Sequence, residues 1–423
     1  MNHFTYQGGE LRCESTPLAT IAGAVGTPTY VYSKRAILES FEAYDQALRD
    51  VPHLIAYSVK ANANLALLAT LAHAGAGADV LSGGELFRAL KAGLLPKKIT
   101  FAGVGKSPEE MREALKAEIL LFNVESQSEL GQLDRAAQEL GLRAPVALRV
   151  NPDVDPKTHP YIATGLKTSK FGIPITKALE AYETASRLPG VEVVGVHMHI
   201  GSQLTSTLPF ADALARVADL VEMLRARGIE VRYLDAGGGL GIRYKDEAPP
   251  TPGDYAAVLV PIVKALGVTL IIEPGRSIVG NAGALLTRVL YLKESDQKHF
   301  VVVDAAMNDL IRPSLYNAFH EIRSVRATDG GSGVVADVVG PICESGDFLA
   351  KDRQLPTVAE GDLLAVMSAG AYGFAMASNY NARPRTAEVL VDGTRYAVVR
   401  RRESYEDLIA GEQLAGEGEG GRQ

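Results

Sequence analysis

The sequence predicts an α/β protein that combines a (β/α)8 TIM-type barrel with a second, antiparallel β domain. Short apolar runs alternate with amphipathic helical stretches from about residue 35 to 278. After Arg276 the alternation stops, and short β-rich runs separated by turn residues follow. A chain of 423 residues also exceeds one comfortable core, which favours two domains.

The barrel is expected over residues 35–278. Its strands are predicted at 54–59, 78–81, 98–102, 119–123, 146–150, 192–198, 232–235 and 269–273. Helices are predicted between them at 65–74, 84–92, 108–116, 127–140, 176–188, 209–227 and 252–266. Because a helix separates each strand from the next, a closed barrel with right-handed crossovers is favoured over an open sheet.

The second domain is expected to join residues 1–34 to residues 279–410. Its predicted β runs are 28–32, 284–291, 300–303, 334–339, 363–366, 386–391 and 394–400. The final segment, 411–423, is rich in glycine and glutamate, a composition typical of a disordered tail.

Composition excludes several classes of protein. The net charge of -7 and the pI near 5.7 argue against nucleic acid and anionic membrane as partners. No apolar run is long enough to span a membrane, and the N-terminal residues lack a signal-peptide pattern. The two cysteines, Cys13 and Cys343, cannot form a disulfide framework or a multi-cysteine zinc site. A reducing cytoplasm is therefore the expected location.

The unusual polar residues follow the carboxyl ends of the predicted strands, where barrels of this kind place their active residues. Lys60 leaves the first strand in YSVKANAN, flanked by Ala and Asn, and is well placed to hold a carbonyl compound as a Schiff base. Taken alone, a lysine is more often a surface residue. The other strand ends carry Asp79, Ser82, Arg149, Asn151, His197, His199, Gly237 to Gly239 and Glu273 to Arg276. This convergence predicts an active site at one rim.

Two glycine-containing loops predict a phosphate site. DAGGGLG follows the seventh strand and EPGR follows the eighth, and barrel phosphate sites usually lie in these two loops. Glycines let backbone N–H groups approach a phosphate without a Cβ in the way. Ser202, in the HIGSQ loop, could add a hydroxyl donor. A flexible turn is the alternative for a lone triple glycine.

His197, His199 and Glu273 each leave alternatives open. The two histidines point to the same side of a strand, so they could begin a metal site in a barrel hydrolase. No other strand end carries a histidine, so we favour one imidazole that stacks on a flat aromatic ligand and one in the core, without a metal. Glu273 could bind a pyridinium nitrogen, and a capping or arginine-paired role is its alternative.

The segment GPICESGDFLAKD of the second domain places Cys343 beside Glu344. A thiol flanked by acids suits a proton donor better than a nucleophile, although inert packing is the alternative for a free cysteine. DAAMNDLIRPSLYNAFHEI supplies Tyr316 and Arg312, a candidate clamp for a carboxylate, unless Arg312 is a surface residue. GAYGFAMASNYN is small, aromatic and polar without strand periodicity.

Together these segments resemble a known family. The set YSVKAN, HMHIGSQ, DAGGGLG, EPGR, DAAMNDLIRP, GPICESGD and GAYGFAMASNYN resembles diaminopimelate decarboxylase. Enzymes of this family depend on pyridoxal 5'-phosphate (PLP) and share the alanine-racemase-like barrel. The motifs run in family order from residue 57 to 381 and cover nearly the whole chain.

The resemblance implies a role for each motif residue. Lys60 would hold PLP, and Cys343 would be the general acid that reprotonates the substrate carbanion. The implied cofactor-binding residues are Lys60, Asp79, His199, Ser202, Gly238, Gly239, Glu273, Gly275, Arg276 and Tyr372, with His199 stacked on the ring and Glu273 on its nitrogen. The implied substrate-binding residues are Arg276, Arg312, Tyr316, Glu344 and Tyr372. Cys343 and Glu344 would come from a partner subunit, which implies a homodimer with shared active sites.

The implied reaction is decarboxylation of meso-2,6-diaminopimelate at its D-centre to L-lysine and CO2, the last step of lysine biosynthesis. A related ornithine or arginine decarboxylase would tend to carry aspartate where Glu344 follows Cys343. An alanine racemase would pair the ring nitrogen with arginine instead of Glu273. A non-catalytic PLP-binding protein would usually lack Lys60 or the cysteine.

Overall fold

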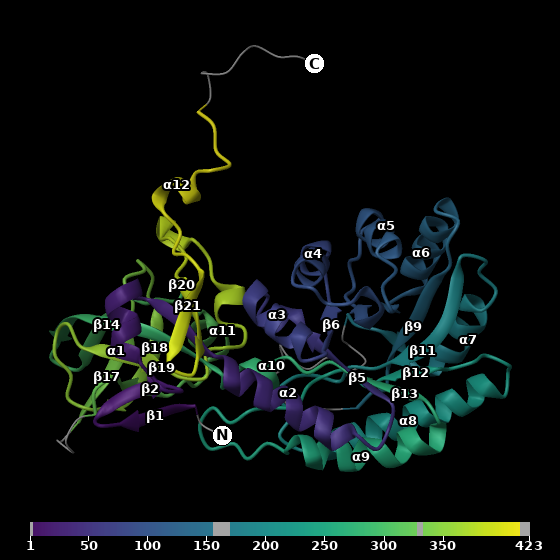
Figure 1. Cartoon of the computed structure of the whole chain (residues 1–423), viewed down its shortest axis with the longest axis horizontal. Helices are drawn as coiled ribbons and strands as arrows, with labels where there is room; N and C mark the ends of the chain where they lie inside the picture. The colour runs from purple at the N-terminus through teal and green to yellow at the C-terminus, as the bar shows by residue number, and fades with distance from the viewer. Residues whose placement is uncertain (1–2, 155–169, 328–332, 415–423) are drawn as a thin grey trace.

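A computed structural model of the chain describes residues 3–154, 170–327 and 333–414. It contains a barrel and a β domain that lie side by side, joined along α2 and α10 (Figure 1). Of the predicted tail, 411–423, residues 415–423 lie outside the described part of the chain. None of the helices in the described part of the chain combines the length and the apolar character that a membrane span needs.

Eight parallel strands form the barrel, and the pairing of β13 with β5 closes it. The strands are β5 (His53–Ser58), β6 (Gly77–Val80), β7 (Ile99–Phe101), β8 (Leu121–Val124), β9 (Ala144–Asn151), β11 (Val191–His197), β12 (Tyr233–Asp235) and β13 (Thr269–Ile272). A short strand, β10 (Ile173–Pro174), adds to the edge of β9. The predicted barrel is confirmed, and the strand ends agree closely with those expected.

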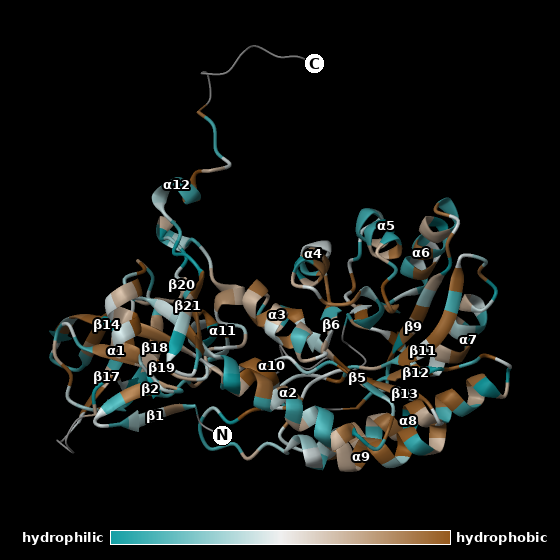
Figure 2. Cartoon of the chain, in the orientation of Figure 1, coloured by the Kyte–Doolittle hydropathy of each residue, from teal (hydrophilic) through white to brown (hydrophobic). Residues whose placement is uncertain are grey.

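An outer ring of helices covers the strands: α3 (Leu65–His73), α4 (Gly83–Lys91), α5 (Pro108–Lys116), α6 (Gln127–Glu139), α7 (Ile175–Ala185), α8 (Leu208–Arg225) and α9 (Pro252–Leu266). In Figure 2 these helices carry both apolar and polar residues. An amphipathic helix of this kind packs its apolar side against the strands and leaves its polar side in solvent. Local signals set the helix starts: Ser107 and Thr251 form capping boxes at α5 and α9. Ser82, which the sequence placed at the rim, caps α4.

Helix α2 (Lys34–Leu48), which precedes the first barrel strand, was not among the predicted helices. Its buried residues include Ile37, Phe41, Tyr44 and Leu48, which recur every three or four positions and so form one apolar face. This face accounts for the packing of α2 on α9 and α10 (Arg276–Val279), between the two domains.

The β domain is built on one large sheet of order β18-β17-β15-β14-β4-β20-β21. Its strands are β4 (Thr29–Ser33), β14 (Gly283–Glu294), β15 (His299–Val303), β17 (Val334–Val339), β18 (Phe348–Leu355), β20 (Ala387–Asp392) and β21 (Arg395–Arg400). In addition, β19 (Leu363–Val366) pairs with β14, and β16 (Ile322–Ser324) pairs with β19. Strand β4, from the N-terminal part of the chain, lies between β14 and β20. Most pairings are antiparallel, whereas β15–β17 and β4–β20 are parallel.

Several small elements escaped the sequence analysis. They are the three-stranded sheet of β1 (Phe4–Gln7), β2 (Glu10–Cys13) and β3 (Thr16–Pro17), helix α1 (Leu18–Val25), and strands β16 and β18. Strand β18 reads FLAKDRQL, and its central residues are charged and exposed, so its sequence lacks the continuous apolar run of a buried strand.

Polar contacts fix the first barrel loop against the β domain. The Asn62 side-chain amide donates to the Gly370 carbonyl at 3.1 Å. Asn64 donates to the buried Glu388 carboxylate at 3.0 Å. Because these contacts are buried, the loop that carries Lys60 is held from both sides, by the barrel below and the β domain above.

Candidate active site

Two connected cavities lie where the carboxyl ends of the barrel strands face the β domain. The larger has a volume of about 480 Å³ and is lined by Lys60, His199, Ser202, Gln203, Tyr244, Glu247, Arg276, Arg312, Tyr316, Asn317, Ala318, Phe319 and Tyr372. The smaller, of about 50 Å³, is lined by Ser58, Lys60, His199, Ser202, Gly239, Leu240, Glu273, Gly275, Arg276 and Tyr372. Most of the residues that the sequence singled out therefore meet at one place.

Lys60 lies in the short turn η1 (Val59–Ala61), directly after β5. Burial lowers the pKa of its ammonium, but Tyr372 and the carboxylates of Asp79 and Glu273 outweigh burial, and the net pKa is raised. Tyr372 is held over this turn, because its backbone N–H donates to the Ala61 carbonyl at 2.8 Å. The Lys60 amine therefore lies close to two carboxylates, those of Asp79 and Glu273.

Asp79, at the third position of β6, is buried behind Lys60. Its Oδ2 accepts a hydrogen bond from the Ser58 hydroxyl at 2.9 Å, and its Oδ1 has no hydrogen-bond partner within the described residues. Burial and the charge of Glu273 raise the pKa of Asp79 well above its usual value. An unsatisfied buried oxygen of this kind indicates that the site is built for a further group.

His199 carries a neutral imidazole. Burial, together with the positive charges of Lys60 and Arg149, holds its pKa well below the usual value. Its Nδ1 accepts a hydrogen bond from the Gly238 N–H at 3.2 Å, which fixes the proton on Nε2. Gly238 allows no side chain, because a Cβ there would lie 2.1 Å from the Glu273 carbonyl oxygen. A neutral, fixed imidazole face suits stacking on a flat ring.

The smaller cavity has the donor set of a phosphate site. The backbone N–H groups of Gly239 and Gly275 donate to no group in the described part of the chain. The Arg276 guanidinium donates to the Ser202 hydroxyl at 3.0 Å and to the Tyr244 hydroxyl at 2.7 Å. Free amides, a hydroxyl and a buried cation together favour an anion with several acceptor oxygens. The residues present therefore fit the phosphate of PLP.

Glu273 lies just beyond β13, on the floor of the site. Asn123 donates to its Oε1 at 3.2 Å, and His197 Nε2 lies 3.5 Å from its Oε2. Burial alone would raise the pKa of Glu273, but His197 and His199 bring it down to about 2. The carboxylate is therefore ionised and can bind a protonated ring nitrogen.

The structure also brings Asp235 to this floor, a residue that the sequence analysis did not single out. Ligand atoms of His197, Asp235 and Glu273 all lie within 4.8 Å of one another, a set that could hold a metal ion. The sequence favoured a site without a metal because no other strand end carries a histidine. In the structure the groups beside His197 are two acids from neighbouring strands, Asp235 and Glu273.

Two arginines flank the larger cavity. Arg312 begins α11 (Arg312–Tyr316), and its guanidinium donates to His320 Nε2 at 3.1 Å while His320 Nδ1 donates to the Met367 carbonyl at 2.8 Å. Burial and the charge of Arg312 lower the pKa of His320 to about 3, so this imidazole is neutral and orients the guanidinium. Arg312 also lies 4.7 Å from the ring centroid of Tyr244. Such a fixed cation fits a carboxylate.

Tyr244 and His320 are residues that sequence reasoning missed. Tyr244 belongs to the loop after β12 and His320 follows α11, so neither lies at the end of a strand. The position of Tyr244 a few residues beyond the triple glycine was the one available signal.

Cys343 and Glu344 are exposed and line neither cavity of their own chain. Their loop is nevertheless well anchored. Asp347 accepts hydrogen bonds from the Ile342 N–H at 2.8 Å and the Met307 N–H at 2.7 Å. Within one chain, the structure does not bring these two residues to Lys60.

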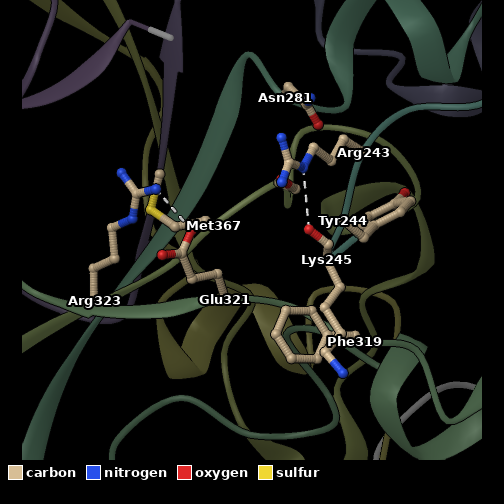
Figure 3. Close-up of a pocket in the computed structure, with 9 residues that line it drawn as sticks. Arg243, Tyr244, Lys245, Asn281, Phe319, Glu321, Arg323 and Met367 are labelled. Atoms are coloured by element: carbon tan, nitrogen blue, oxygen red, sulfur yellow. Dashed lines mark hydrogen bonds and ion pairs between the residues drawn. The ribbon is translucent and has the colours of Figure 1, made fainter. Parts of the chain in front are cut away.

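A third cavity, of about 720 Å³, lies beyond Tyr244 and Phe319, which it shares with the larger of the two cavities above (Figure 3). Its other residues are Arg243, Lys245, Asn281, Glu321, Arg323, Met367 and Ser368. Figure 3 shows the ion pair of Glu321 and Arg323 facing Arg243 across the space. Although this cavity is larger, it lacks Lys60, the glycine loops and Glu273, so we assign the chemistry to the other two.

Comparisons with known proteins agree with this site. The pyridoxal-binding domain of the pyridoxal-dependent decarboxylases matches residues 34–280, which defines the class of the protein. Diaminopimelate decarboxylase of Pseudomonas aeruginosa is 56% identical over 414 residues, covering 98% of this chain and 99% of that protein. The relative from Aquifex aeolicus is 53% identical and covers 96% of both.

Solved structures show the same likeness. Diaminopimelate decarboxylase from M. jannaschii in complex with L-lysine superposes with a TM-score of 0.93 at 41% identity and covers 98% of both chains. The Helicobacter pylori enzyme, also with L-lysine, gives a TM-score of 0.90 at 45% identity and covers 93% of this chain and 98% of that one. The chain belongs to the diaminopimelate decarboxylase family, as its motifs indicated.

Proposed function

We propose that this protein decarboxylates meso-2,6-diaminopimelate at its D-centre, with PLP as cofactor, and so forms L-lysine and CO2 in the last step of lysine biosynthesis. The observation that carries the proposal is the joint position of Lys60, the donor-rich smaller cavity and the two arginines at one rim. The high identity to diaminopimelate decarboxylases supports the choice of substrate over ornithine or arginine.

The cofactor would be held by Lys60, Asp79, His199, Ser202, Gly238, Gly239, Glu273, Gly275, Arg276 and Tyr372. Lys60 Nζ would bond it covalently, and the amides of Gly239 and Gly275 with Arg276 would hold its phosphate. When bound, PLP supplies an electron sink for the electron pair left behind as CO2 departs. Glu273, ionised on the floor of the site, would hold a proton on the ring nitrogen.

The protein's own groups would orient the substrate. Arg276, Arg312 and Tyr316 would bind the carboxylate that is retained, so that the D-centre carboxylate points away from the ring plane, where its bond can break. The Tyr372 ring, whose centroid lies 4.8 Å from the guanidinium carbon of Arg276, would close the site and exclude water.

The proton donor and the distal amine contact would come from a second copy of the chain. The partner subunit's Cys343 would give its thiol proton to the carbon that lost CO2, and the partner subunit's Glu344 would bind the distal ammonium. The exposure of both residues outside their own cavities supports a homodimer with shared sites.

The remaining proposals concern organisation and location. We propose residues 35–278 as the PLP-binding domain, with residues 1–34 and 279–410 as the β domain that completes the site. Both cysteines are free, which fits a reducing cytoplasm.

The test is CO2 release from purified protein with PLP, offered meso-diaminopimelate, L-ornithine and L-arginine in parallel, with the amino-acid product identified by chromatography. We expect release from diaminopimelate alone, with L-lysine as product. Release from ornithine or arginine instead would overturn the proposed role of Glu344, and no release from any of them would refute the proposed activity.

A further inference from the structure

The floor of the active site holds a buried polar cluster drawn from three neighbouring strands, β11, β12 and β13, and from β8, which is not adjacent to them. Asn123 (β8), His197 (β11), Asp235 (β12) and Glu273 (after β13) meet there, and their side chains are almost completely inaccessible to solvent. Asn123 Nδ2 donates to Asp235 Oδ2 at 3.0 Å and to Glu273 Oε1 at 3.2 Å. One amide group therefore bridges two buried carboxyl groups.

The two carboxyl groups differ in charge. Burial and the charge of Glu273 raise the pKa of Asp235 well above its usual value, which favours its neutral form. Glu273 keeps the negative charge, because His197, His199 and a hydrogen bond with Asp235 together more than offset its burial. Asp235 accepts hydrogen bonds from two neutral amide donors, the Asn123 side chain at 3.0 Å and the Gly237 N–H at 3.0 Å, and it shares a hydrogen bond with Glu273. Glu273 also has an imidazole beside it.

His197 is buried beside the carboxyl groups of Asp235 and Glu273. Only 1% of its surface is exposed, and neither ring nitrogen has a well-formed hydrogen bond within the described residues. The near contact is Nε2 to Glu273 Oε2, at 3.5 Å. A buried imidazole without partners is unfavourable, so its place beside an anion calls for a function. His197 lines neither cavity, so it contacts neither cofactor nor substrate directly.

We propose that His197 is a positioning residue for Glu273: its Nε2, 3.5 Å from one carboxylate oxygen, keeps Glu273 an anion that can hold a proton on the ring nitrogen of PLP. This inference rests on the proposed cofactor site. Without the imidazole donor, the proton between the ring nitrogen and Glu273 shifts to the carboxylate oxygen. The ring is then neutral and a weaker electron acceptor, although the phosphate and Lys60 still hold it in place.

The test compares His197→Leu, which removes the donor, with His197→Gln, which restores an N–H donor. His73→Leu, on the exposed surface of α3, is the matched control. The ¹⁵N resonance of the pyridine nitrogen, measured in holoenzyme loaded with ¹⁵N-labelled PLP, reports the position of the proton without any substrate. We expect a pyridinium signal in wild type, in the control and in the Gln variant, and a neutral-pyridine signal in the Leu variant.

Kinetics supply the second measurement. Loss of this polar contact to a charged group predicts a kcat about 10- to 100-fold lower in the Leu variant, with KM unchanged and partial rescue by Gln. If the Leu variant fails to fold, His197→Phe keeps a ring without the donor and tests the same point. A pyridinium signal in the folded donor-free variant would overturn the proposal.

A metal analysis closes the remaining alternative. Stoichiometric divalent metal in wild type that disappears in the Leu variant would show that His197, Asp235 and Glu273 are ligands, and would also overturn the proposal. The proposed activity is tested separately: wild type could fail to release CO2 while the ¹⁵N signals still behave as expected, or release CO2 while they do not.

Discussion

Mixing two inactive variants gives the sharpest test of the shared active site. Lys60→Ala removes the buried amine, and Cys343→Ala removes the exposed thiol that lines neither cavity of its own chain. Each homodimer should be inactive or nearly so, since loss of a general acid slows a reaction by about two or more orders of magnitude.

The expected recovery follows from counting sites. In a mixed dimer, one site contains both substitutions and the other contains an intact Lys60 and an intact Cys343 from opposite subunits. Random exchange of equal amounts makes about half of the dimers mixed, so activity should recover to about one quarter of the wild-type value per subunit in a twofold dimer.

The assay unfolds and refolds the equimolar mixture, or coexpresses the two chains with different tags, and measures CO2 release. A mixture of Cys343→Ala with a second cysteine variant, Cys343→Ser, is the control, because its dimers contain no intact thiol and should show no such gain. If the Lys60 and Cys343 variants also fail to complement while mixed dimers are demonstrably present, the two residues act within one chain and the shared-site proposal is refuted.

Three further predictions concern single substitutions. Lys60→Ala should abolish the absorbance band of lysine-bound cofactor as well as turnover; a retained band and turnover would show that another group binds PLP. His320→Leu should raise KM for diaminopimelate by about tenfold with little change in kcat, because Arg312 loses the neutral acceptor that orients it; an unchanged KM would contradict this role. Burial raises the pKa of Asp309 to about 7, so its native form binds a proton more tightly than the unfolded chain, and stability should fall as pH rises from about 4 to 7. Thermal melts of Asp309→Asn should show a flatter pH dependence over that window, and parallel curves for variant and wild type would count against it.

The sequence predicted the barrel well for a physical reason. Each strand is buried on both faces and appears as a continuous apolar run, and each helix between strands shows an amphipathic period, so the two signals differ clearly. The rim residues follow from the same pattern, because parallel strands bring their carboxyl ends to one edge.

The elements that escaped prediction lack these signals. Strand β18 has exposed charges at its centre, and β3 spans two residues. Tyr244 and His320 enter the site from loops whose paths depend on tertiary contacts, such as the His320 contact with the Met367 carbonyl. Asp235 ends β12 directly before the triple glycine, and a single acid at a strand end has no distinctive sequence signal of its own.

The anchoring of the Cys343 loop connects the two proposed halves of the site. Helix α11 carries Arg312 and Tyr316, which line the cavity of their own chain. The same helix holds the loop, because the Ser314 hydroxyl donates to the Gly346 carbonyl at 2.6 Å. In the proposed dimer, one rigid segment would therefore contribute carboxylate binding to one active site and proton donation to the other. A long-range rearrangement would not be needed to complete either site, because docking of the two preformed surfaces in the proposed dimer would bring the thiol and the distal contact into place.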